Sequence, residues 1–139
     1  MKKRCLSTLC GAFAVFALGG LSAQAEAPEA AICAVQQVIT CPQFEACERA
    51  LPSSVNMPVL MKIDRLTGVI VSRRESGEER TSKIGTESGD DAVHILQGTE
   101  EGRTWSMRVK LETGAFTLTS ADADVGYVAF GSCSSTLLK

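Results

Sequence analysis

Residues from which catalytic sites are usually built are scarce in this chain. Its 139 residues include one histidine, one tryptophan and one tyrosine, and aromatic residues make up only 5%. The histidine, His94, alternates with the apolar Val93 and Ile95, which predicts a place on the solvent face of a strand. The sequence has neither a G-x-S-x-G nucleophile elbow nor a glycine-rich phosphate loop. We therefore expect that the protein is not an enzyme and that it has neither catalytic residues nor a cofactor.

Sequence signatures of metal and redox centres are also missing. A zinc site usually pairs cysteines two to four residues apart, and a thioredoxin-like centre needs C-x-x-C. Neither spacing occurs among Cys33, Cys41, Cys47 and Cys133, whose gaps hold seven, five and 85 residues. The stretch DADVG at residues 122–126 has too few oxygen ligands for an EF-hand and is interpreted as an acidic turn before the last strand. No metal site is predicted.

The first 25 residues have the organisation of a secretory signal peptide. The basic start KKR at residues 2–4 precedes a nearly uncharged apolar run, and AQA at residues 23–25 supplies a cleavage site. A transmembrane anchor is the alternative, but serine, threonine and glycine interrupt the run, and a span needs roughly 20 apolar residues. We predict a signal peptide over residues 1–25 and a single β domain over residues 26–139. The domain is expected in the periplasm or outside the cell, without membrane insertion after cleavage.

Negative charge prevails in the predicted mature chain. Without the three cations of the signal it has 11 Lys and Arg against 16 Asp and Glu, a net charge of −5. A mildly acidic surface is unfavourable for binding nucleic acid or anionic lipid. The length suffices for one domain with one core, and the sequence does not indicate an oligomeric state.

The four cysteines of the mature chain are expected to form two disulfides, because exported proteins with an even number of cysteines usually do so. Four cysteines allow three pairings. Cys41 and Cys47 flank PQFEA, a loop short enough to close as a hairpin and to bring their Cα atoms together. That pairing leaves Cys33 with Cys133, near the two ends of the domain. The spacing favours this pairing without excluding the other two.

Proline and glycine divide the chain unevenly. All four prolines lie at or before Pro58, whereas nine glycines follow it. Between the glycines the sequence alternates with a period of two, as in TWSMRVKL at residues 104–111, which is typical of half-buried strands. Two hairpins turn through Thr-Gly, and we expect Gly68 and Gly114 to take a positive φ there.

These patterns predict an all-β protein: a small antiparallel meander of seven to eight strands, closing to a barrel or packing as a sandwich, and stapled by disulfides. Residues 44–51 are interpreted as strand or irregular, because the helical spacing there is short. A disulfide between the first and last strands favours a barrel, since it would secure the seam where the sheet edges meet. The bulky residues Trp105, Met107, Phe116 and Leu118 are predicted to point inward and to fill the interior.

Two charged turns are the candidate binding sites. SRRESGEER at residues 72–80 and TEEGRT at residues 99–104 place cations beside acidic residues in predicted exposed turns. A salt-bridged, soluble surface is one interpretation, and a protein-binding tip on a rigid sheet is the other. The candidate partner-binding residues are Arg73, Arg74, Ser76, Arg80, Glu100, Glu101 and Arg103.

The sequence features at the two ends of the domain are similar to those of two groups of proteins. An early cluster of three cysteines and a closing GYVAFGSC enclose a meander with LQGTEEGRTWSM in its middle. In this the chain resembles small, uncharacterised secreted β-proteins of bacteria. In format it is also similar to periplasmic β-barrel inhibitors, such as the membrane-bound inhibitors of c-type lysozyme, which place a loop serine and a loop lysine in the lysozyme cleft. Ser76-Gly77 and Ser88-Gly89 are similar to the serine loop, but no lysine–glycine loop accompanies them, so no residue is carried over.

The sequence thus predicts a non-enzymatic periplasmic or secreted binding protein of unassigned specificity. We expect it to engage a protein partner, such as a lysozyme or a protease, through exposed loops in the manner of an inhibitor. The alternative is a barrel-type carrier of a small apolar ligand. The two hypotheses differ in the interior, because a carrier needs a large enclosed apolar cavity and a loop binder needs only a packed core.

Overall fold

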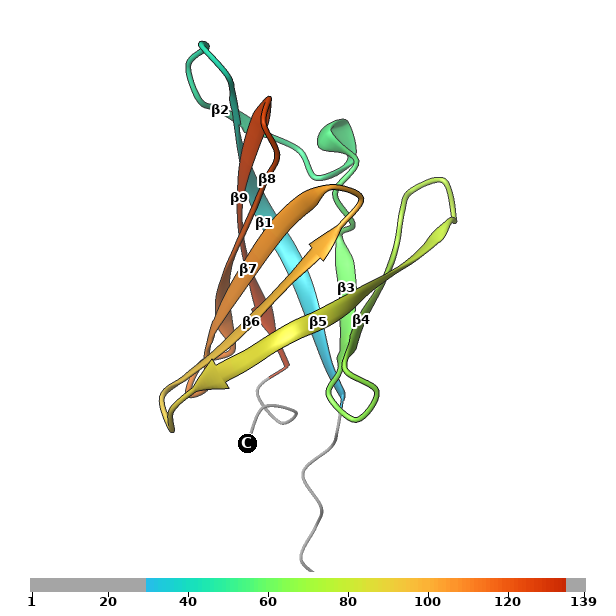
Figure 1. Ribbon diagram of the computed structural model, residues 1–139, viewed down its shortest axis with the longest axis vertical. Coiled ribbons are helices and arrows are strands. Elements are labelled where there is room, and N and C mark those ends of the chain that lie inside the picture. The colour runs from blue at the N-terminus through green and yellow to red at the C-terminus, as the bar shows by residue number, and fades with distance from the viewer. Residues whose placement is uncertain (1–29, 135–139) are drawn as a thin grey trace, which may run out of the picture.

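The structure, a computed structural model, describes residues 30–134. The predicted signal peptide at residues 1–25 lies outside this range, as do residues 26–29 and 135–139 of the predicted domain. The elements are β1 (Ala30–Pro42), β2 (Glu48–Ala50), the 3-10 turn η1 (Ser53–Val55), β3 (Leu60–Asp64), β4 (Val69–Arg73), β5 (Glu79–Gly89), β6 (Val93–Glu100), β7 (Arg103–Lys110), β8 (Ala115–Ala121) and β9 (Val125–Cys133) (Figure 1). The predicted all-β class is confirmed.

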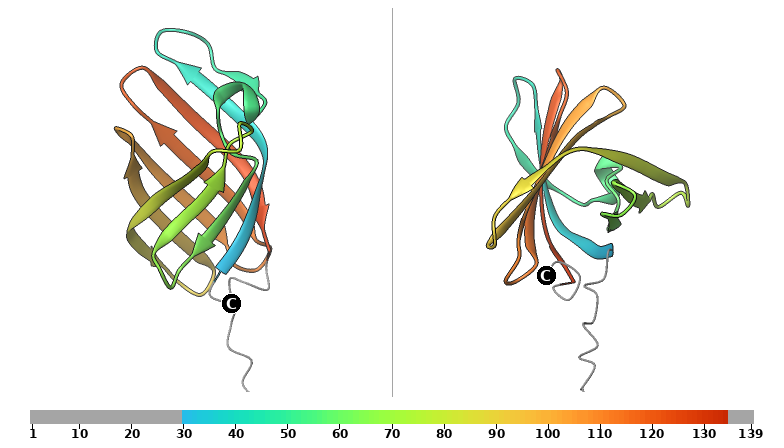
Figure 2. Two further views of the ribbon diagram at one scale, coloured as in Figure 1. Left: turned by 90° about the vertical axis from the view of Figure 1, so that its right-hand side faces the viewer. Right: turned by 60° about the horizontal axis from the view of Figure 1, so that its bottom comes forward.

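Eight of the strands close into a barrel. Each strand from β3 to β8 pairs antiparallel with the next, and β1 completes the circle by pairing with β9 on one edge and β3 on the other. Figure 2 shows the tilted strands wrapping around a common interior. β1 pairs with three strands because it is 13 residues long. One of its edges pairs with β9, and on the other edge its first half pairs with β3 and its second half with β2. Of the two predicted architectures the barrel is the one present, with β2 as an additional strand.

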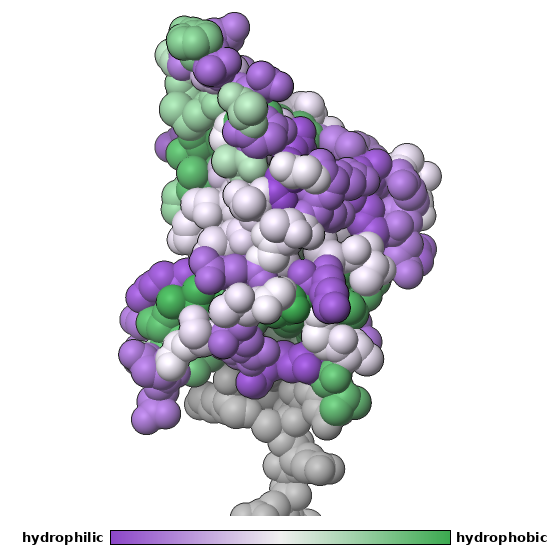
Figure 3. Space-filling model, viewed as in Figure 1, coloured by the Kyte–Doolittle hydropathy of each residue, from purple (hydrophilic) through white to green (hydrophobic). Residues whose placement is uncertain are grey.

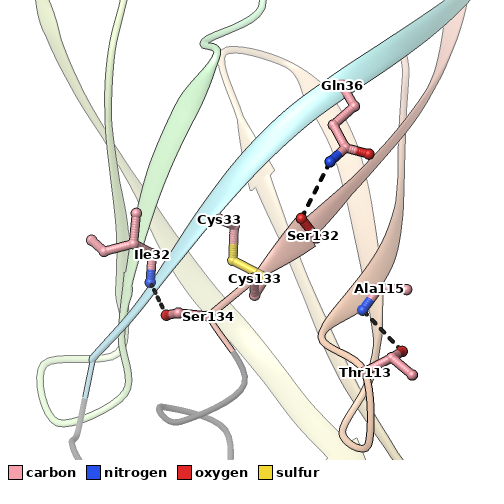
Figure 4. Close-up of a disulfide and its surroundings, with 8 residues drawn as sticks. All are labelled: Ile32, Cys33, Gln36, Thr113, Ala115, Ser132, Cys133 and Ser134. Carbon is pink, nitrogen blue, oxygen red and sulfur yellow. Dashed lines mark hydrogen bonds between the residues drawn. A yellow bond between two sulfur atoms is a disulfide. The ribbon is translucent and has the colours of Figure 1, made fainter.

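A disulfide fastens the seam between the first and last strands of the barrel. Cys33 of β1 and Cys133 of β9 are cross-strand partners and are bonded to each other (Figure 4). Beside them the backbone N–H of Ile32 donates to Ser134 Oγ at 3.3 Å. The bond therefore joins the two strands whose pairing closes the circle, as the cysteine spacing favoured.

The connections between strands fall at two ends of the barrel (Figure 1). One end, which we call the loop end, carries the connections β1–β2, β4–β5, β6–β7 and β8–β9, together with η1. The second disulfide, Cys41–Cys47, closes the β1–β2 connection there. The opposite end carries the remaining turns, including the two Thr-Gly hairpins. Gly68 and Gly114 have φ angles of 66° and 73°, which confirms the positive φ expected of these turns.

Apolar side chains fill the interior over most of its depth. The register places Met107 opposite Leu96 on one side and Leu118 on the other, so neighbouring strands direct these residues to the same face. The buried core consists of Ala31, Cys33, Val35, Val38, Met61, Ile63, Ile70, Leu96, Trp105, Met107, Val109, Phe116, Ala129 and Cys133. These residues come from seven of the eight barrel strands, and the inward placement predicted for the bulky residues of β7 and β8 is confirmed.

The predicted exposure of His94 is wrong. The residue shares the inward face of β6 with Leu96, and only 12% of its side chain is exposed. Its Nε2 lies 2.6 Å from Oε1 of Glu87. The prediction assumed that the apolar Val93 and Ile95 face inward. They lie on the outward face of β6 and are half-buried there, so apolar character did not distinguish the two faces of this strand.

Candidate functional site at the loop end

The two charged turns predicted from the sequence lie side by side at the loop end. β5 and β6 are neighbours in the sheet, so the β4–β5 connection comes next to the β6–β7 turn (Figure 1). Arg80 Nη2 lies 2.7 Å from Glu100 Oε1 and 2.9 Å from Glu101 Oε2. Arg74 Nη2 reaches the same Glu101 oxygen at 3.5 Å. These four predicted residues form one ion-pair cluster, which we call the arginine–glutamate network, and Figure 3 shows hydrophilic side chains gathered over this part of the surface.

The other three predicted residues lie outside this network. Arg73 points to the outer face of β4, where an exposed ion pair joins it to Glu79 at 3.6 Å. Ser76 is an exposed residue of the β4–β5 connection. Arg103 donates from Nε to Asp122 Oδ2 at 2.7 Å, and its guanidinium lies 5.4 Å from the centre of the Tyr127 ring. The structure thus brings four of the seven candidates together.

Arg80 is more buried than was predicted when it was assigned to an exposed turn. Only 16% of its side chain is exposed, and it lies on the inward face of β5, in register with Ser72. Ser82, two residues further along β5, hydrogen-bonds to Glu100 from the same face. Ion pairs that are partly shielded from water are stronger than fully exposed ones. Arg80, Ser82 and Glu100 therefore belong to the inward-facing residues of the barrel at the loop end.

A pocket of about 90 Å³ opens into the barrel at this end. Its lining includes the polar Ser72, Arg80, Ser82, Glu100, Arg103 and Ser120, and the apolar or aromatic Val55, Met57, Pro58, Met61, Ile70, Trp105, Leu118 and Tyr127. The polar residues occupy inward-facing positions at the loop end of strands whose other inward-facing residues are apolar. On β8, for example, Ser120 shares the inward face with Phe116 and Leu118. The interior thus changes from apolar to polar toward the loop end.

This pocket was not predicted from the sequence. Inward positions were assigned from apolar residues alone, so the serines that share the same periodicity were left without a role. The available signal was the period itself, because a serine two residues after a buried apolar residue in a strand lies on the same face. Ser72 after Ile70 and Ser120 after Leu118 both satisfy that criterion.

Electrostatics fix the β8–β9 turn beside the pocket. The backbone N–H of Asp124, the Arg103 guanidinium and the backbone N–H of Val125 together lower the pKa of Asp122 to about 2. The hydrogen bond to Asp122 raises the pKa of Arg103 in turn. Both groups are therefore charged at neutral pH. The acidic turn predicted before the last strand is present, and its carboxylate serves hydrogen bonding within the turn.

The disulfide-closed β1–β2 connection, which we call the stapled loop, carries an exposed aromatic ring. Phe44 is 96% exposed, the highest value among the large apolar residues of the described chain. The loop is fixed by the Cys41–Cys47 bond and by a hydrogen bond of 2.7 Å from the Gln43 N–H to the Asp124 carbonyl of the β8–β9 turn. A restrained backbone therefore presents the ring of Phe44 to solvent. The exposure of Phe44 was not predicted from the sequence, where this stretch was interpreted only as a loop closed by a disulfide.

Backbone strain is concentrated at the same end. Three non-glycine residues of the described chain have a positive φ: Phe44 at 66°, Asn56 at 55° and Glu101 at 49°. All three lie in loop-end connections. Residues held in such conformations cost roughly 1–3 kcal/mol each and tend to cluster at functional sites. For a bulky residue such as Phe44 the conformation is particularly uncommon.

Within residues 30–134, no group of three or more His, Cys, Asp or Glu side chains is placed to hold a metal ion. The same part of the chain has no helix that is both long enough and apolar enough to cross a membrane. Comparison of the chain with protein-family models, with curated proteins and with solved structures finds no match in any of the three.

Proposed function

We propose that this is a non-enzymatic protein of the periplasm or the extracellular space, which binds a protein partner through its loop end in the manner of an inhibitor. The main observation behind the proposal is the exposure of Phe44. Its aromatic ring is almost fully exposed to solvent, its backbone has a positive φ, and its loop is closed by a disulfide. The two disulfides support export, because such bonds persist in oxidising compartments.

Phe44 has the properties of an interface anchor. Aromatic residues are enriched in the buried centres of protein interfaces, and burying a phenylalanine side chain contributes about 1.5–3 kcal/mol. The stapled loop is already closed and hydrogen-bonded before it meets a partner. Little conformational entropy is then lost on binding, which raises affinity. A narrow protruding loop of this kind suits a cleft on the partner.

The arginine–glutamate network supplies a charged surface at the same end. Interfaces commonly surround an apolar centre with a polar rim, and the network and Arg103 lie at the same end of the barrel as the stapled loop, where they can form part of such a rim. The alternative of an apolar-ligand carrier has less support. Pockets for drug-sized ligands have volumes of roughly 300–1,000 Å³, whereas the pocket here has about 90 Å³.

Site-specific photo-crosslinking in the native host tests the proposal. A photoreactive phenylalanine analogue would replace Phe44 in one variant and Leu66 in a matched control. Leu66 is 72% exposed and lies in the β3–β4 turn at the opposite end of the barrel. We expect a discrete protein adduct from position 44 and none from position 66. Equal adduct patterns from both positions, or no adduct from position 44, would overturn the proposal.

A further inference from the structure

Two residues that line the loop-end pocket carry buried hydrogen-bond donors without a partner in residues 30–134. Trp105 is 8% exposed, and its Nε1 is fully buried without a hydrogen-bond partner among the described residues. Nε of Arg80 is buried and unpartnered in the same way. Both residues line the pocket. Buried polar atoms are almost always hydrogen-bonded, so two unsatisfied donors at one pocket call for an explanation.

The position of the indole follows from the register. Trp105 lies opposite Gly98 on β6, and a Cβ on that glycine would come within 2.7 Å of the indole Cε2. The ring therefore lies over the backbone of Gly98, against the wall of the barrel. On its other side β8 contributes Ser120, the cross-strand partner of Trp105. Trp105 and Ser120 both line the pocket, together with Arg80 and Ser82.

We infer that the pocket binds a small ligand, or the head of a larger one, that carries an oxygen acceptor and a short apolar portion. The free groups of Trp105 and Arg80 can only donate hydrogen bonds, so a ligand that satisfies them must accept. Met57, Met61 and Leu118 provide an apolar wall for the remainder of the ligand. A carboxylate and a neutral carbonyl share this acceptor chemistry.

The size of the pocket limits what enters it. A volume of about 90 Å³ is well below the roughly 300–1,000 Å³ of pockets that hold drug-sized ligands. A chain of a few carbons with one acceptor group fills such a space, and a larger molecule would protrude at the loop end. This inference does not depend on Phe44 or on the proposed protein partner, because none of its contacts involves the stapled loop.

Titration followed by NMR provides a direct test, because the chain has a single tryptophan and therefore a single indole N–H signal. The probes are butyrate, butyramide and butylamine, which share a four-carbon length but differ in the end group. They are added at constant pH and ionic strength. We expect a saturable shift of the indole N–H signal with butyrate, butyramide or both, in the millimolar range, and no such shift with butylamine. A response to butyrate alone assigns a carboxylate, and equal responses to both assign a neutral carbonyl.

Two variants locate the effect. Ser120→Leu places apolar volume in the pocket and should abolish the response. Ala115→Leu alters an exposed residue at the other end of β8 and should leave the response unchanged. An equal response to all three probes would show that the pocket does not recognise an acceptor group, and no response to butyrate or butyramide would show that it binds neither. Either result would refute the inference. The comparison of the three probes on the unmodified protein decides the matter even where Ser120→Leu does not fold.

Discussion

Removing the two disulfides separately should have clearly different effects on stability. In the chain-entropy treatment, the gain from a disulfide grows with the length of chain that it closes. Cys33 and Cys133 are 100 residues apart, which corresponds to about 4.7 kcal/mol. Cys41 and Cys47 are six residues apart, which corresponds to about 2 kcal/mol. Replacing both cysteines of the seam by alanine should therefore cost at least about 2.5 kcal/mol more than the same change in the stapled loop.

Packing increases this difference. Cys33 and Cys133 belong to the buried core, whereas Cys47 is exposed, so only the seam variant also loses buried contacts. Urea unfolding at 25 °C, followed by the fluorescence of Trp105, measures both losses. Since a small domain has a total stability of about 5–15 kcal/mol, the seam variant should unfold at low urea or be largely unfolded in water. Equal losses for the two variants, or a larger loss for the stapled loop, would refute the assignment of Cys33–Cys133 as the bond that holds the barrel closed.

Three further predictions follow from the packing and charges. Gly98→Ala should destabilise the fold by about 1–3 kcal/mol in urea unfolding, because an added Cβ would lie 2.5 Å from a backbone carbonyl and from the indole ring. Gly85→Ala, with its nearest neighbour at 3.6 Å, should change stability by less than about 1 kcal/mol. A double-mutant cycle on Arg80 and Glu100 should give a coupling of about 1 kcal/mol, and a value near zero would contradict their partly buried pairing. Asp122 has a pKa of about 2 in the folded protein, below its ordinary 3.8, so its contribution to stability is complete above about pH 4 and is lost as the pH falls through 2. Thermal unfolding of Asp122→Asn should consequently show a shallower decline between pH 4 and pH 2 than the parent protein.

Local patterns in the sequence predicted much of the fold. Thr-Gly turns and period-two alternation located the hairpins, and the short gap between Cys41 and Cys47 favoured the disulfide pairing that is present. Local patterns did not determine whether the sheet closes into a barrel, because the strands of a barrel and of a sandwich have the same alternation of apolar and polar residues. It depends on β1 pairing with β9 about 100 residues away, which no local pattern encodes.

The candidate site was predicted only in part, for a related reason. Arg80 and Glu100 were identified by their charge, but their partial burial follows from strand register, which sets which face of the sheet a residue occupies. Ser120 and Ser72 were missed because polar residues were assumed to face outward. The conformation of Phe44 comes from the closed loop around it, and sequence periodicity does not report on a turn of this kind.

Phe44 is proposed to anchor a protein partner, and a comparison of binding affinities tests this. The partner identified by crosslinking would be titrated calorimetrically with the parent protein, with Phe44→Ala and with Leu66→Ala. Both side chains are exposed, so both substitutions should leave the stability within about 0.5 kcal/mol of the parent value. Truncating an anchor residue usually costs 2 kcal/mol or more, so Phe44→Ala should weaken binding by about 30-fold and Leu66→Ala by less than about twofold. Equal affinities of the two variants for the partner would show that Phe44 is not an anchor.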